Sequence, residues 1–357
     1  MITFSQQSAN ALPPEARAFY AAMNDCSKAT MQLHPVHARN IRMNSTWQAW
    51  MAKHPNLPKE IFPAHLIAGL DRNFGENVDL LQNVVLSHFE KLQVQITDKM
   101  CNDMLPGSLS AAASLMFWSR RHMIIETTAA LEEVLLHSDL GNDLPIDLIR
   151  PPFPACYIRL GAAFQQAVVT TPMHQAMGEH TLQGVYVFEA VSGERRGLSF
   201  VPIFTVPALS KIAAGSIYMS IDDENASTDA LIKMVCNDVG ASQSPHFQSI
   251  VQLCAKIFLY MNLSQTVQLD DLSYTLALKQ LANYGPKKLA KRQRQIFHLY
   301  DRILVGPQTL AQHGTGMHGE VAPHVRRGHF RMQAHGPKYS KRRVLFIAPT
   351  WIRADRL

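Results

Sequence analysis

The sequence lacks the features of membrane and secreted proteins. Its 357 residues contain no apolar run that approaches the roughly eighteen residues of a membrane-spanning helix. Residues 1–7 have neither the basic patch nor the apolar block of a signal peptide. We therefore expect a cytoplasmic protein without a membrane partner.

Cysteine is scarce, and its spacing argues against structural cross-links. The five cysteines are odd in number, widely spaced and mostly within apolar segments. This pattern is typical of reduced, buried thiols and not of a disulfide framework. No two cysteines are separated by two residues, which argues against a zinc site built on thiolates. Cys156 lies in an apolar stretch, so we expect a core residue there and not a nucleophile.

The motifs of common enzymes are also missing. The chain has no P-loop, no glycine-rich dinucleotide fingerprint, no HExxH and no GxSxG sequence. Asp222, Asp223 and Glu224 form an acidic cluster, which would need further ligands to hold Mg²⁺, so a solvated turn is expected. We therefore assign no cofactor and no metal, and favour a non-catalytic binding protein over an enzyme.

The sequence does contain a strongly uneven charge. Residues 286–357 carry fifteen Lys or Arg and only three acids, a balance of +12. Because the whole chain sums to +6, residues 1–285 carry −6. An acidic body with a cationic C-terminal region favours a polyanionic partner, most often a nucleic acid.

Composition and apolar spacing predict an α+β protein with three domains. With 47% hydrophobic and 17% charged residues, the chain is globular and not disordered. Residues 1–143 are predicted to be helical, since apolar residues recur every three or four positions over 78–92 and 109–136. Residues 144–305 should form an α+β core domain with a central antiparallel sheet flanked by helices. Residues 306–357 should be a basic linker and a C-terminal β-hairpin module.

The elements expected in the second half of the chain are these. Strands of an antiparallel meander are expected at 156–160, 185–191, 198–201 and 217–221. Helices are expected from Thr228, over 247–261, and, with a basic surface, from Pro286. The arms of the hairpin should be 325–333 and 342–348, joined across 336–340.

The cations of this basic region are the candidate nucleic-acid-binding residues. Arg grips phosphate with a planar fork, and Lys adds less directional charge. Phe330, Tyr339 and Trp351 interleave with them, which suits stacking on unpaired bases. A solvated surface above ordinary core aromatics is the alternative. The candidates are Lys287, Lys288, Lys291, Arg292, Arg294, Arg326, Arg327, His329, Phe330, Arg331, Arg342 and Arg343.

Histidines in the same region leave a catalytic alternative open. Five recur between His313 and His335, but Glu320 is the only nearby acid, so metal binding is not expected. His324 and His329 could instead serve as acid and base in RNA cleavage, since imidazole titrates near neutrality and Arg stabilises a charged phosphate. The alternative functions are thus a toxin-like endoribonuclease and a general nucleic-acid-binding accessory factor.

One stretch carries a family resemblance. The run from His324 to Phe330 (HVRRGHF), followed by Gly336, the strand RVLFI over 343–347 and Pro349, resembles the phage and plasmid family of a type V-A anti-CRISPR protein. Weaker matches upstream are Leu144-Pro145 followed by CYI at 156–158, and GVYV at 184–187. The resemblance spans about 140–357 and is dense only in 322–349. Phe330 stands where the family has tryptophan.

The resemblance implies a function at the level of protein synthesis. The family's characterised activity is inhibition of CRISPR immunity by blocking production of the effector nuclease. The inhibitor recognises the N-terminal segment of that effector during translation and provokes loss of its mRNA. The implied partners are a nascent polypeptide, mRNA or the ribosome, and a host ribonuclease if RNA is not cleaved by the protein itself. The target peptide is not fixed by the resemblance.

Overall fold

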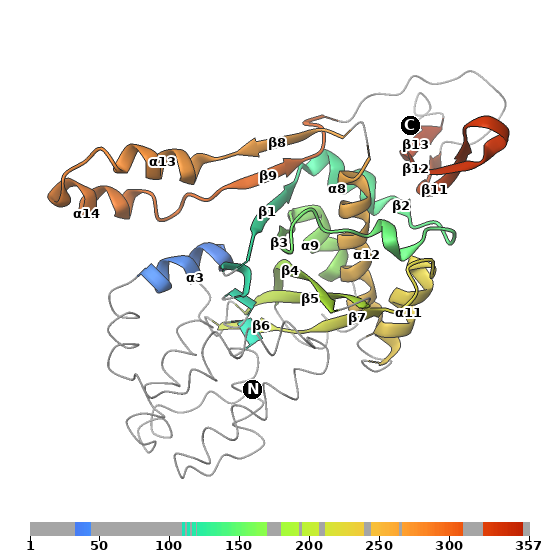
Figure 1. Cartoon of the computed structure of the whole chain (residues 1–357), viewed down its shortest axis with the longest axis horizontal. Helices are drawn as coiled ribbons and strands as arrows, with labels where there is room; N and C mark the ends of the chain where they lie inside the picture. Colours follow the sequence, from blue (N-terminus) through green and yellow to red (C-terminus); the bar gives the residue numbers. More distant parts are fainter. Residues whose placement is uncertain are drawn as a thin grey trace, which may run out of the picture.

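The computed structural model describes much of the second half of the chain and parts of the first. The described residues are 33–43, 109–110, 113–114, 116–118, 120–169, 180–192, 195–206, 211–238, 244–263, 266–309 and 324–352. Within them, helices pack against a mixed sheet, and a smaller C-terminal sheet lies beside it (Figure 1). The α+β fold class is therefore confirmed. The helix expected over 78–92 lies outside the described residues.

In the described part of the chain, the central sheet has eight strands, ordered β6-β5-β4-β3-β1-β9-β8, with β7 also paired to β5. The meander predicted from the sequence is confirmed, because β3, β4, β5 and β7 pair antiparallel in succession. The strands are β1 (His122–Thr127), β3 (Ala155–Arg159), β4 (Thr181–Ser192), β5 (Arg195–Val206), β6 (Lys211–Ala214), β7 (Ile217–Ile221), β8 (Gln268–Asp271) and β9 (Arg302–Val305).

Strand β1 corrects the prediction of one continuous helix over 109–136. It pairs in parallel with both β3 and β9, so the sheet is mixed and not wholly antiparallel. Ile124 and Ile125 are both buried, but in two different core clusters on opposite faces of the sheet. Only a strand buries neighbouring residues on opposite faces in this way. The helix resumes as α8 (Ala129–Leu136), where the Thr128 hydroxyl accepts the Leu131 N–H at 3.2 Å and caps the first turn.

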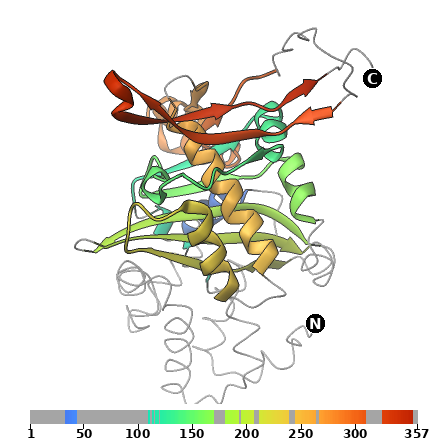
Figure 2. The ribbon, with the colours of Figure 1, turned by 90° about the vertical axis from the view of Figure 1, so that its right-hand side faces the viewer.

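One face of the sheet is covered by four helices around the larger core cluster. These are α8, α9 (Ala162–Val169), α11 (Thr228–Asp238) and α12 (Ser244–Met261). Figure 2 shows α11 and α12 side by side over this face. The apolar stripe predicted along 247–261 is buried in the cluster, which confirms that helix. The other face carries a smaller cluster that includes Val36 of α3 (His34–Met43).

Between β8 and β9 the chain leaves the sheet as an arm. It contains α13 (Ser273–Leu281) and α14 (Pro286–Gln295), and it projects from the body of the molecule (Figure 1). The basic helix expected from Pro286 is thus confirmed. Its position is set by the antiparallel pairing of β8 with β9, from Gln268 opposite Val305 to Asp271 opposite Arg302.

The C-terminal hairpin is confirmed within one to three residues of its expected bounds. It consists of β11 (Gly328–His335) and β12 (Lys341–Ile347), joined by the short helix η3 (Pro337–Tyr339). Gly336 has a φ of 78°, a conformation that favours glycine, where the chain turns into η3. β2 (Ser138–Asp139) pairs with the other side of β11, and β10 (His324–Arg326) pairs with β13 (Thr350–Ile352).

A buried histidine joins α3 to the sheet, and it makes stability depend on pH. His34 lies 2.7 Å from the Tyr186 hydroxyl through Nδ1 and 2.6 Å from the Ser110 hydroxyl through Nε2. Burial, reinforced by the nearby charge of His37, lowers the pKa of His34 to about 3. Between pH 6.5 and 3 the unfolded chain therefore binds a proton that the folded protein does not, and stability falls as pH falls.

We predict that, as pH falls below 6.5, the free energy of unfolding of the wild type decreases by about 1 kcal/mol per pH unit more than that of His34→Gln. Urea unfolding measures both. His298→Gln, at an exposed position, provides the control for replacing a histidine by glutamine. A difference between wild type and His34→Gln that does not change from pH 7.5 to pH 4.5 would contradict this account of His34.

Candidate nucleic-acid interface and adjoining groove

The two faces of the C-terminal hairpin differ because side chains alternate along each strand. Four apolar residues point inward and pack on the larger core cluster: Phe330, Met332, Val344 and Phe346. The rings of Phe330 and Phe346 stack with centroids 4.5 Å apart. The alternate positions form the outward face and are mostly cationic or polar: His329, Arg331, Gln333, His335, Lys341, Arg343 and Leu345.

Phe330 corrects the predicted set of base-stacking residues. Its side chain is 0% exposed, so it belongs to the core and is not available to a nucleic acid. The alternation Phe330, Met332 on one arm and Val344, Phe346 on the other was the sequence signal that could have shown this. Tyr339, at the tip of the hairpin, is 75% exposed, whereas the Trp351 side chain lies outside the described residues.

The paired arginines at the start of the hairpin are exposed but not equivalent. Arg327 holds Asp139 of β2 with 3.0 Å between Nη1 and Oδ1. Both side chains are more than half exposed, so this ion pair adds at most about 1 kcal/mol and mainly orients Arg327. Arg326, in β10, has no ion-pair partner within the described part of the chain. Arg331, Arg342 and Arg343 are exposed as well.

The cations of α14 lie apart from those of the hairpin. The Lys287 side chain lies outside the described residues. The other four cations are exposed: Lys288, Lys291, Arg292 and Arg294. α14 is near the tip of the arm, at the opposite end of Figure 1 from β11 and β12. The sequence grouped these residues by charge alone, but the structure presents two separate basic surfaces.

The catalytic candidates fall into two groups. His329 is half-buried in β11, and His324 is in β10 with a side chain outside the described residues, so the pair stays a prediction. Cys156 is fully buried, and desolvation raises the pKa of its thiol to about 12, which confirms a core residue. Asp222, Asp223 and Glu224 are exposed, in the turn expected before α11. Within the described ranges, no group of three His, Cys, Asp or Glu is placed to hold a metal.

A buried carboxylate that sequence reasoning missed lies at the base of the arm. Glu126 of β1 accepts hydrogen bonds from the Tyr300 hydroxyl at 2.6 Å and from Arg159 at 3.0 Å, both at Oε1. Its Oε2 accepts from Arg302 at 2.6 Å, and Arg302 also holds Asp271 at 3.0 Å. A glutamate within the apolar strand HMIIET was the available signal. The network satisfies a charge that burial would otherwise penalise.

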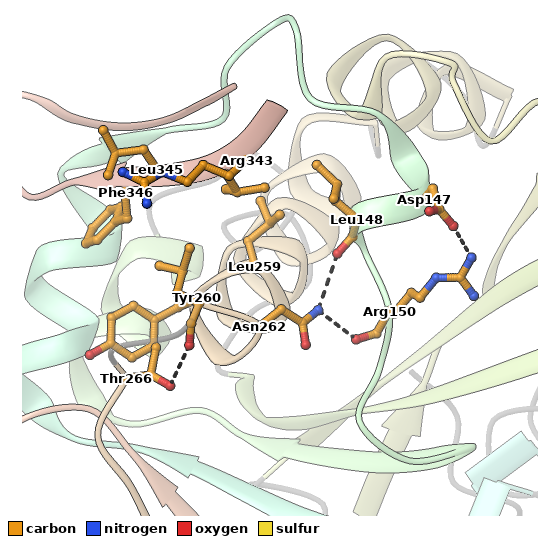
Figure 3. A pocket seen from close by; sticks show the side chains of 12 residues that line it. Asp147, Leu148, Arg150, Leu259, Tyr260, Asn262, Thr266, Arg343, Leu345 and Phe346 are labelled. Carbon is orange, nitrogen blue, oxygen red and sulfur yellow. Dashed lines mark hydrogen bonds and ion pairs between the residues drawn. The ribbon is translucent and has the colours of Figure 1, made fainter. Parts of the chain in front are cut away.

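A groove of about 710 Å³ runs beside the hairpin (Figure 3). Its walls come from the segment around the short helix η1 (Ile146–Leu148), from the C-terminal turns of α12 and from β12. The Asn262 side-chain amide donates to the carbonyl oxygens of Leu148 at 3.4 Å and Arg150 at 3.3 Å, which ties two of these walls together. The lining residues are Asp147, Leu148, Arg150, Leu259, Tyr260, Asn262, Leu263, Thr266, Arg343, Val344, Leu345 and Phe346.

Comparison with known proteins identifies the family. The model of the anti-CRISPR type V subtype A2 (AcrVA2-like) family matches residues 125–354, well over half of the chain. The chain belongs to this family. The matched range includes most of the sheet, the arm, the groove and the hairpin, so every element of the candidate interface is family sequence. No curated protein and no solved structure matches the chain.

The AcrVA2-like match confirms the resemblance seen in the C-terminal motif and extends it into β1. It places the stretch from His324 to Phe330 inside the family region, where part of that stretch serves the core and part faces outward. Among the described residues, no helix is long and apolar enough to cross a membrane. Three features of the family region make up the candidate interface: the outward face of the hairpin, the arginines beside it and the groove.

We predict that Phe330→Ala lowers the free energy of unfolding by about 3–5 kcal/mol, because it leaves a cavity where the hairpin joins the larger core cluster. Urea unfolding followed by circular dichroism measures the effect. As the matched control, Leu276→Ala removes an apolar side chain that is 54% exposed on α13 and should change stability by less than about 1 kcal/mol. Equal losses for the two variants would mean that Phe330 is not a core residue.

Proposed function

We propose that this anti-CRISPR family member recognises a nascent polypeptide and its translating mRNA, so that the target protein is not made. The match to the AcrVA2-like family over 125–354 is the observation that carries this proposal. Such a function requires two surfaces on one protein, one for a polypeptide and one for RNA. The hairpin region offers both, since a cationic face lies beside a groove with apolar and polar lining residues.

The exposed arginines on and beside the hairpin support RNA contact through charge. Arg326, Arg327, Arg331, Arg342 and Arg343 are all exposed. One guanidinium group can bind two oxygens of the same phosphate, and each phosphate that is neutralised releases counterions from the RNA. Binding of this kind is independent of base sequence, so selection of one mRNA would come from the nascent polypeptide. In this proposal the protein acts in the cytoplasm near ribosomes, and a host ribonuclease completes the loss of the message.

Charge reversal tests the RNA surface. We predict that Arg326→Glu with Arg327→Glu weakens binding of a fluorescent single-stranded RNA by at least about tenfold at 50 mM salt, since two phosphate contacts are lost and repulsion is added. Fluorescence anisotropy measures the affinity, and thermal melting reports folding. Lys233→Glu with Lys279→Glu makes the same change in net charge at exposed positions on α11 and α13 and should bind nearly as the wild type does.

RNA binding retained by the folded arginine variant would refute this surface. Equal affinity for duplex DNA and single-stranded RNA would favour a general nucleic-acid-binding accessory factor. Cleavage of RNA by purified wild type, lost in His324→Ala or His329→Ala, would favour the endoribonuclease.

Co-purification tests translation coupling directly. Tagged protein is isolated from translating cells, with and without ribonuclease, and the bound RNA is sequenced. We expect one mRNA to be enriched, and we expect its enrichment to vanish when initiation is blocked. Diffuse RNA, or enrichment that does not depend on translation, would contradict the proposed function.

A further inference from the structure

The groove beside the hairpin runs along the edge of a strand. Four consecutive residues of β12, Arg343 to Phe346, line it, although their side chains alternate between the two faces of the hairpin. Consecutive residues border one groove only where the backbone edge of the strand borders it. Among the described residues, β12 is the terminal strand of the sheet β12-β11-β2, and the edge of β12 that does not pair with β11 faces the groove.

The backbone groups that face the groove follow from the ladder. The Met332 N–H donates to Asp143 Oδ2 at 3.3 Å, on the side of β11 away from β12. A Cβ on Gly141, on that same side, would clash with the Phe330 carbonyl oxygen, so this carbonyl also points away from β12. In an antiparallel ladder, when one residue of a pair points its N–H and C=O away from the partner strand, the residue opposite it does the same. These partners are Val344 and Phe346, which therefore direct their backbone groups toward the groove.

The wall facing β12 contains an apolar patch that is held in place. Leu148, Leu259 and Leu263 supply apolar side chains, and the Asn262 bonds fix η1 against the end of α12. The Tyr260 ring meets Phe346 edge-on with centroids 6.0 Å apart. A strand added to β12 would thus place one set of side chains against an ordered apolar surface.

The other face of the groove is positive. Arg343 is exposed and has no ion-pair partner within the described residues, and Lys341 lies two residues before it on the same face. Arg150 is already engaged, at 3.3 Å from Glu224 and by a hydrogen bond to Asp147. The alternate side chains of an added strand would therefore meet unpaired positive charge.

We propose that the free edge of β12 binds an extended polypeptide segment with alternating apolar and acidic residues, which adds to the sheet as a fourth strand. This deepens the proposed function, because it gives the site and the chemical pattern of the recognised polypeptide. The backbone N–H and C=O groups of Val344 and Phe346 supply affinity, and the two faces of the groove supply specificity. RNA fits less well, since its backbone cannot continue a ladder.

The test uses three fluorescent twelve-residue peptides on the full chain. One alternates valine with glutamate, one alternates valine with lysine, and one has the first composition arranged in pairs (VVEE). We expect the first to bind at least about tenfold more tightly than the other two. Val344→Pro should weaken it at least about tenfold, since proline removes the N–H that points to the groove and leaves the ladder to β11 intact. Val344→Thr keeps that N–H and should bind as the wild type does.

Amide hydrogen exchange gives a second readout that needs no variant. The amides of Val344 and Phe346 should exchange more slowly with the valine–glutamate peptide bound, while the exposed arm at α13 should not change. Equal affinity for the three peptides, no binding, or Val344→Pro binding as the wild type does would overturn the proposal. The proposal would also be overturned if single-stranded RNA displaced the peptide and if RNA binding were itself lost in Val344→Pro. The groove would then be an RNA site.

The two proposals can fail separately. If the wild type enriches an mRNA in a translation-dependent way but binds none of the peptides at β12, the groove proposal fails and the proposed function stands. If the valine–glutamate peptide binds at β12 but no message is enriched, the reverse holds.

Discussion

The carboxylate of Glu126 is the interaction on which the arrangement of strands depends. Glu126 lies one residue before the end of β1, which has parallel neighbours on both sides, and its two carboxylate oxygens accept hydrogen bonds from arginines of β3 and β9. Removing either cation would leave this buried carboxylate with one arginine fewer, which destabilises the fold because a buried charge needs its partners. Because Arg302 also holds Asp271 of β8, the same group fixes the base of the arm to the sheet.

The helical and hairpin patterns near the C-terminus were predictable because local sequence agrees with the fold. The stripe along α12 and the alternation of β11 and β12 each match the face that is buried. β1 was missed because its short apolar run is equally consistent with a helix, and only pairing with β3 and β9, distant in sequence, makes it a strand. The two basic surfaces were merged for a related reason, since charge counted along a chain carries no information on distance in space.

The C-terminal hairpin has three surfaces with three different chemistries. Its inward face completes the core through Phe330 and Phe346, its outward face carries arginines, and its edge borders the groove. The residues that made the family recognisable in the sequence thus divide between stability and exposure, and a substitution among them acts through one or the other according to its position in the alternation.

The arm begins and ends at one pair of neighbouring residues, Asp271 of β8 and Arg302 of β9. The segment between these two residues leaves the sheet after Asp271 and returns at Arg302, so its length can change without changing the order of the strands. Because Tyr300, within the arm, donates a hydrogen bond to Glu126 of β1, a change in the length of the arm must leave the residues next to Arg302 in place. A reporter domain inserted at the tip of the arm, between α13 and α14, should therefore leave the hairpin and its groove unchanged.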